Sequence, residues 1–231
     1  MDLFTDLLME ILEVIITIPI VLVALTFHEY SHGLIAYKLG DPTAKYMGRL
    51  TLNPLKHLDL VGTLCMIVCR FGWAKPVPVD MRQFKNPKRG MAICAIAGPL
   101  SNLLLGFIGT FIFWLLVLLF PNILFNYYLR YFLSLFAILN IYLAIFNLIP
   151  LPPFDGSRVL TAFLPDKYYI KLLQNERKIA LGFFLILILD GYVLGGFISS
   201  GLATIVDWIF SSFISFFNLF VWGKYGRTNT I

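Results

Sequence analysis

Long runs of apolar residues dominate this sequence and set the kind of fold that it can adopt. Runs long enough to cross about 30 Å of hydrocarbon as helices lie at 7–27, 91–119, 131–149, 179–199 and 202–222. Hydrophobic residues make up 59% of the chain and charged residues only 13%, and this charged share is about half of that in soluble proteins. The sequence therefore predicts an all-α polytopic membrane protein with about five transmembrane helices surrounded by lipid.

A sixth apolar run, at 58–73, is shorter and interrupted. It leads into the stretch AKPVPVD, where two prolines favour extended backbone. We expect 58–81 to enter the membrane and return on the same side, partly as a helix and partly as a hairpin. No repeat, low-complexity tract or appended soluble domain is visible, so we expect 1–231 to form one membrane-embedded domain. Its core would span about 7–160 and its C-terminal helical pair about 179–222.

Basic residues are unevenly distributed between the apolar runs. Many lie in 38–89, in 155–178 and in the C-terminal tail, whereas only Arg130 lies between the second and third runs. By the positive-inside rule, we expect the N-terminus outside and the three basic regions in the cytoplasm. The formal net charge of +5 therefore reflects membrane topology, and no nucleic-acid partner is expected. The acidic N-terminus is unlike a cleaved signal peptide, so the first run should be retained as a span.

The first apolar run ends in the sequence His28-Glu29-Tyr30-Ser31-His32. Histidines at i and i+4 share one helix face, so both imidazoles can reach one metal ion. Glu29 stands beside them and can take a proton from water without binding the metal. This HExxH arrangement is typical of zinc hydrolases. The alternative is a pair of hydrogen-bonded histidines in the core.

Catalytic zinc usually has a third protein ligand and an open position for water. His57 is one candidate, but Asp155 is the better one. Pro150, Pro152 and Pro153 end the third run and leave irregular backbone before Asp155, on the same side of the membrane as the HExxH sequence. Such backbone is tolerated at membrane depth only where protein or a watery cavity surrounds it. The alternative is an ordinary turn in which Asp155 caps a helix.

Other polar and extended segments suggest how a substrate is handled. Asn102 and Asn147 lie in apolar runs, and each can donate to a developing oxyanion or hold a substrate backbone. Interhelical hydrogen bonding is an equally good interpretation of both. The stretch 71–80 can offer a strand edge to an extended substrate, or it can plug the site from the cytoplasm. Its candidate contact residues are Phe71, Trp73, Val77 and Val79.

Four motifs in order resemble the site-2 protease family of intramembrane zinc metalloproteases. They are HEYSH at 28–32, Asn53-Pro54 with His57 and Asp59, GPLSN at 98–102, and NLIPLPPFDG at 147–156. The resemblance covers about 20–160 and implies one zinc held by His28, His32 and Asp155, with Glu29 activating water in a three-helix core. It implies that transmembrane helices of other proteins are the substrates, and that the protein lies in a prokaryotic cell membrane with its site toward the cytoplasm. Phe154 departs from the leucine that members often carry there.

Two other functions compete with a protease. A zinc or proton transporter would use intramembrane carboxylates, and Asp190 and Asp207 lie in or near the last two apolar runs. However, the sequence shows no repeated halves, which transporters often have. A catalytically inactive scaffold that binds membrane helices is the other alternative, and the intact HExxH sequence argues against it. The sequence carries no indication of an oligomeric state.

Overall fold

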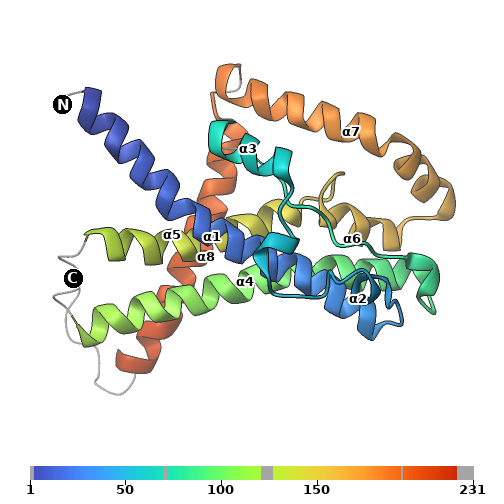
Figure 1. Cartoon of the computed structure of the whole chain (residues 1–231), viewed down its shortest axis with the longest axis horizontal. Helices are drawn as coiled ribbons and strands as arrows, with labels where there is room; N and C mark the ends of the chain where they lie inside the picture. Colours follow the sequence, from blue (N-terminus) through green and yellow to red (C-terminus); the bar gives the residue numbers. More distant parts are fainter. Residues whose placement is uncertain (1–2, 70–71, 121–126, 194, 223–231) are drawn as a thin grey trace.

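The computed structural model describes residues 3–69, 72–120, 127–193 and 195–222, and the regular secondary structure of this part of the chain is helical (Figure 1). No strand of the described residues pairs into a sheet, which confirms the predicted all-α class. The α-helices are α1 (Leu3–Lys38), α2 (Thr43–Tyr46), α3 (Leu60–Cys69), α4 (Pro87–Leu119), α5 (Tyr127–Asn147), α6 (Asp155–Phe163), α7 (Asp166–Tyr192) and α8 (Phe197–Trp222). Two short 3-10 helices cover Pro54–Lys56 and Met81–Gln83.

Four of the described helices are long and apolar enough to cross a membrane, and they indicate a multi-pass membrane protein. These segments are Ile11–Lys38, Pro87–Leu119, Tyr127–Asn147 and Phe197–Leu219. The expected span at 179–199 is not among them. Helix α7 begins with a charged half and ends at Tyr192, so the apolar part from Ile179 is only about 21 Å long at 1.5 Å per residue.

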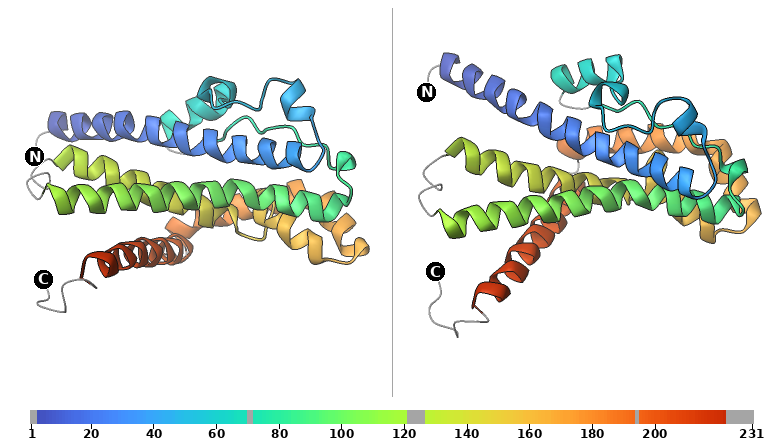
Figure 2. Two further views of the ribbon diagram at one scale, coloured as in Figure 1. Left: turned by 90° about the horizontal axis from the view of Figure 1, so that it is seen from below. Right: turned by 60° about the horizontal axis from the view of Figure 1, so that its bottom comes forward.

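Helix α4 is the centre of the molecule and packs against α1, α5, α6 and α8. Helices α1, α4 and α5 lie side by side as a three-helix layer (Figure 2). Small residues permit this close approach. A Cβ atom at Gly106 of α4 would lie 2.7 Å from a side-chain carbon of Ile141 on α5, so only glycine fits there. Ala24, Ala137 and Ala144 are fully buried in the same layer.

The segment after α3 lies extended across the C-terminal half of α1. Residues 72–80 have no helical structure, and one antiparallel bridge joins Leu58 to Ala74. The predicted mixture of helix and extended backbone in 58–81 is therefore present, although the hairpin is reduced to a single bridge. The arrangement places the extended segment next to the HExxH sequence.

The prolines after α5 return the chain toward α1. Helix α5 ends at Asn147, a turn follows, and α6 begins at Asp155. A Cβ atom at Gly156 would collide with the backbone of Leu148 and Ile149. Glycine therefore lets the first turn of α6 fold back onto the end of α5, and this turn carries the Asp155 carboxylate to α1.

Candidate metal centre

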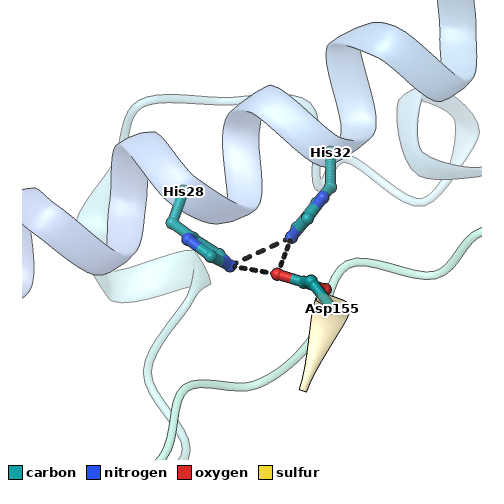
Figure 3. Close-up of side chains that lie close together, drawn as sticks. All are labelled: His28, His32 and Asp155. Carbon is teal, nitrogen blue, oxygen red and sulfur yellow. Dashed lines mark hydrogen bonds and ion pairs between the residues drawn. The ribbon is translucent and has the colours of Figure 1, made fainter. Parts of the chain in front are cut away.

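Three side chains from α1 and α6 converge at one point (Figure 3). His28 Nε2 and His32 Nε2 lie 3.0 Å apart. Asp155 Oδ2 lies 3.0 Å from the first of these nitrogens and 3.2 Å from the second. Among the described residues, these three form the one group of His, Cys, Asp or Glu with this spacing.

Hydrogen bonds on the far side of each ring fix the tautomers of both histidines. His28 Nδ1 lies 2.6 Å from Asn102 Oδ1, and His32 Nδ1 lies 2.8 Å from the carbonyl oxygen of Cys94. Because an amide or carbonyl oxygen only accepts, both Nδ1 atoms must carry the proton and donate it. In the neutral form of each ring, which is the form that binds a metal, the Nε2 atom then presents its lone pair toward Asp155. Partners of this kind orient histidine ligands in metal sites.

This donor set fits a zinc ion. With both rings neutral, three lone-pair atoms at 3.0–3.2 Å repel one another unless a cation lies between them, and metal ligands must be in such deprotonated forms. For zinc–nitrogen distances of about 2.0–2.1 Å, neighbouring ligands of a tetrahedral ion lie about 3.3 Å apart. The observed separations are close to this value, and two imidazoles with one carboxylate leave a fourth position open.

The surroundings of the three side chains leave room for an ion. Gly98 of α4 faces both rings, and a Cβ atom there would lie 2.5 Å from His32 Nε2 and 2.6 Å from His28 Nε2. Any side chain at this position would occupy the space that the donor atoms face. The glycine of the GPLSN motif is therefore required by the geometry of this centre.

Asn102 links the candidate metal centre to the helix layer. Its side chain is fully buried, and its Nδ2 atom donates to Ala24 O and to Asn140 Oδ1 at 3.0 and 3.1 Å. Both amide hydrogens are thus engaged within the protein. Asn140 was not among the predicted site residues, although an amide side chain in an apolar run is a signal that could have identified it. The Cys94 carbonyl gave no such signal because it is a main-chain atom.

Glu29 lies beside the cluster and outside it. Glu29 is one of the residues that line a cavity of about 600 Å³, together with the three converging residues. Glu29 Oε2 accepts a hydrogen bond of 2.7 Å from the backbone N–H of Val77. The residue is therefore in contact with the extended segment 72–80, and it faces the same space as the candidate ligands.

The other predicted site residues are distributed around this cavity. Trp73, Val77 and Val79 line it together with Asn147, whose Nδ2 atom donates to Leu143 O. Phe71 lies outside the described residues. His57 is buried elsewhere, and one ring nitrogen contacts Thr51 O at 2.8 Å; it takes no part in the three-residue cluster.

Comparisons with known proteins agree with this geometry. The sequence profile described as "Peptidase family M50" matches residues 122–189. "Putative zinc metalloprotease YwhC" of Bacillus subtilis (strain 168) is 44% identical over 179 residues, which cover 77% of this chain and 80% of that protein. "Putative zinc metalloprotease MJ0611" of Methanocaldococcus jannaschii is 32% identical over 157 residues, covering 65% of this chain and 72% of that protein.

"Zinc metalloprotease MJ0392" of the same archaeon is 33% identical over 171 residues, which cover 73% of this chain but only 40% of that protein. No solved structure matches the chain significantly. The family resemblance expected from the four motifs is confirmed by these relatives, two of which this chain covers over more than two thirds of their length. The chain therefore belongs to peptidase family M50, the site-2 protease family of zinc metalloproteases.

Proposed function

We propose that the protein is an intramembrane zinc endopeptidase that hydrolyses peptide bonds in transmembrane segments of other membrane proteins. The convergence of His28, His32 and Asp155 at the end of an apolar helix carries this proposal. Glu29 supports it because its carboxylate faces the same cavity without belonging to the cluster. A reactive group at this place meets its substrate inside or close to the lipid.

Each residue of the centre has a distinct role in this proposal. His28, His32 and Asp155 would hold one zinc ion per chain, which would supply polarisation of the scissile carbonyl and a lowered pKa of water. Glu29 takes a proton from the attacking water and delivers it to the leaving amine. Asn147, which lines the cavity, holds the substrate backbone.

The extended segment 72–80 presents the substrate. A helical substrate has its carbonyls in hydrogen bonds, so cleavage requires it to unwind locally. Trp73, Val77 and Val79 line the cavity, and within the described residues the Val79 N–H has no hydrogen-bond partner. A free backbone donor on an extended segment is what strand addition uses. The alternative is that segment 72–80 plugs the site. In that case, variants that loosen the segment should cleave the substrate faster than wild type.

We further propose a single domain over 1–231 in the cell membrane, with the N-terminus outside and the metal centre toward the cytoplasm. Five crossings would place the C-terminus in the cytoplasm, as the basic tail predicts. Four crossings would place it outside, and α8 runs back toward the end of the bundle where α1 begins (Figure 2). A C-terminal reporter enzyme that is active only outside the cytoplasm separates the two arrangements.

A transporter is the weaker alternative because its best carboxylate is already engaged. Asp190 accepts hydrogen bonds from the backbone of Ile198 and Ser199 and from the Ser199 hydroxyl, at 2.8–3.0 Å. These contacts cap the start of α8. Asp190 therefore has a structural role in this fold and does not face the metal centre.

The decisive experiment compares wild type with Glu29→Gln in detergent, measuring zinc content and cleavage of a panel of transmembrane-helix fusions. We expect equal zinc in both proteins and cleavage by wild type alone. Glu176→Gln is a matched control because Glu176 is a half-buried carboxylate that pairs with Arg158 and belongs neither to the three-residue cluster nor to the cavity lining, so it should leave both readouts unchanged. Zinc without cleavage in wild type would contradict the endopeptidase proposal, and absence of zinc would contradict the ligand assignment.

A further inference from the structure

We propose that Arg49 is a positioning residue for Glu29 and acts through the peptide unit between Pro76 and Val77. This inference rests on the proposed role of Glu29 as the base. Arg49 follows the short helix α2 and lies 20 residues after Glu29 in the sequence. Among the described residues, the hydrogen bonds of both side chains go to the extended segment that crosses α1.

Arg49 is a buried cation with main-chain partners. It is 8% exposed, and its Nη2 atom donates to Lys75 O at 2.6 Å and to Pro76 O at 3.3 Å. No carboxylate of the described residues forms an ion pair with it, and its Nε atom has no partner there. Burial of a charge without a counter-ion is costly, so this arginine does not serve stability alone.

Val77 provides the only N–H group in its immediate stretch. It lies between Pro76 and Pro78, and neither proline has an amide hydrogen. The flanking rings also keep the backbone extended. The Val77 N–H donates to Glu29 Oε2 at 2.7 Å, so the one donor that this stretch has is directed at the proposed base.

Arg49 and Glu29 hold opposite edges of the same peptide unit. The carbonyl of Pro76 and the N–H of Val77 belong to one planar group, in which they point in opposite directions when the bond is trans; this bond is not among the cis bonds of the described residues. Arg49 binds the carbonyl edge and Glu29 accepts from the N–H edge. Because Arg49 fixes the carbonyl edge, it also fixes the direction of the Val77 N–H on the other edge. Its positive charge on the carbonyl further polarises that N–H group.

The consequence is a carboxylate with one oxygen anchored and one oxygen available. Glu29 Oε2 is held by Val77, whereas no hydrogen bond to Oε1 occurs within the described residues. The anchored oxygen sets the orientation of the group, and the other can take the proton. Other contacts keep the segment in place without Arg49, since Lys75 N donates to His57 O and Asp80 N to Asp41 Oδ2. Loss of Arg49 should therefore release one peptide unit and leave the segment docked.

The kinetic test uses a transmembrane-helix fusion that wild type cleaves. We expect Arg49→Met to retain zinc, to lower kcat by about ten- to a hundredfold because small misplacements of a catalytic group have such effects, and to change KM less than about threefold. Arg49→Lys should recover much of kcat, since one nitrogen makes both contacts. Arg82→Met is the matched control because the Arg82 side chain is exposed and, among the described residues, bonds to Asp80 alone.

A double-variant cycle separates positioning from general support of the fold. Val77→Pro deletes the N–H donor itself, so it should lower kcat as Arg49→Met does. If both changes act through one hydrogen bond, the combined variant should be no slower than the more impaired single variant. The proposal would be overturned if the reductions in kcat of the two single variants multiplied in the combined variant. It would also be overturned if Arg49→Met raised KM and left kcat unchanged.

A second readout does not depend on cleavage. Hydrogen–deuterium exchange of the peptide containing Val77 should be at least about tenfold faster in Arg49→Met than in wild type, and unchanged in Arg82→Met. The absence of cleavage in wild type would count against the proposed function alone, because the exchange result still decides the role of Arg49. Unchanged protection of Val77 in Arg49→Met would overturn the positioning role even in an active protease.

Discussion

At the scale of single residues, the proposed metal centre depends on atoms outside the set of candidate ligands. The Nδ1 atoms of His28 and His32 are both engaged by oxygen acceptors, and in neutral rings this leaves both Nε2 lone pairs facing Asp155. Without these acceptors either ring could rotate or change tautomer. The HExxH sequence supplies the imidazoles, but Asn102 and the Cys94 carbonyl on α4 give these candidate ligands a defined direction.

Asn102→Ala should weaken zinc binding by about 10–100-fold, as is usual when a partner of a histidine ligand is removed. Asn102→Asp keeps an acceptor for His28 Nδ1 and should retain more affinity than Asn102→Ala. Competition with a chelator of known affinity measures both. If Asn102→Ala instead lowered kcat and left zinc affinity unchanged, Asn102 would act on the substrate oxyanion, the role that the sequence also permits.

Gly98→Ala should abolish zinc retention with little loss of fold. The added methyl group would lie 2.5–2.6 Å from both Nε2 atoms, which is incompatible with two imidazoles and an ion in the same space. Gly182→Ala on α7 is a suitable comparison because no atom lies within 4 Å of its added Cβ, and alanine favours a helix by about 1 kcal/mol over glycine. Full zinc content in purified Gly98→Ala would show that α4 can move away from α1.

At the scale of elements, helices with a strong local signal were predictable and contacts between distant segments were not. The apolar runs predicted α1, α4, α5 and α8 because helix length and hydropathy are local properties. The three prolines before Asp155 predicted the irregular turn that brings the carboxylate to α1. The hydrogen bond from Val77 to Glu29 joins a main-chain donor to a side-chain acceptor 48 positions away in the sequence. No local pattern of residues could predict it.

At the junction of α7 and α8, a strong local signal led to a wrong prediction. The apolar run 179–199 predicted a span. However, Asp190 accepts hydrogen bonds from the backbone N–H groups of Ile198 and Ser199, and these bonds stabilise a tight turn between α7 and α8. Capping carboxylates of this kind are worth about 0.5–2 kcal/mol. The run is thus divided between two helices.

Asp190→Ala should therefore loosen this turn. We expect a lower thermal midpoint in detergent and faster proteolysis between α7 and α8, with zinc content unchanged because the metal centre lies on other elements. Asp207→Asn is the control, since Asp207 is exposed on α8. Loss of zinc in Asp190→Ala would mean that the C-terminal pair supports the metal centre, contrary to this arrangement.

At the scale of the whole molecule, the metal centre joins the first part of the bundle to the segment that follows its third long helix. His28 and His32 belong to α1 and Asp155 to α6, and α4 packs against both helices. The long helices already contact one another through small residues and through the Asn102–Asn140 hydrogen bond. A bound ion should therefore fasten α6 to a bundle that is formed without it.

Removal of the metal should abolish cleavage but leave the helices folded. A ligand that binds only the folded state stabilises it by about 2.7 kcal/mol at a hundred times its dissociation constant, so chelation should lower the thermal midpoint by several degrees and added zinc should restore it. Circular dichroism should show the same helix content in both states, because the α1–α4–α5 layer does not depend on the ion. In His32→Ala the midpoint should no longer respond to zinc. Complete loss of helix on chelation would instead make the ion part of the folding core, as in small zinc domains that are unfolded without their metal.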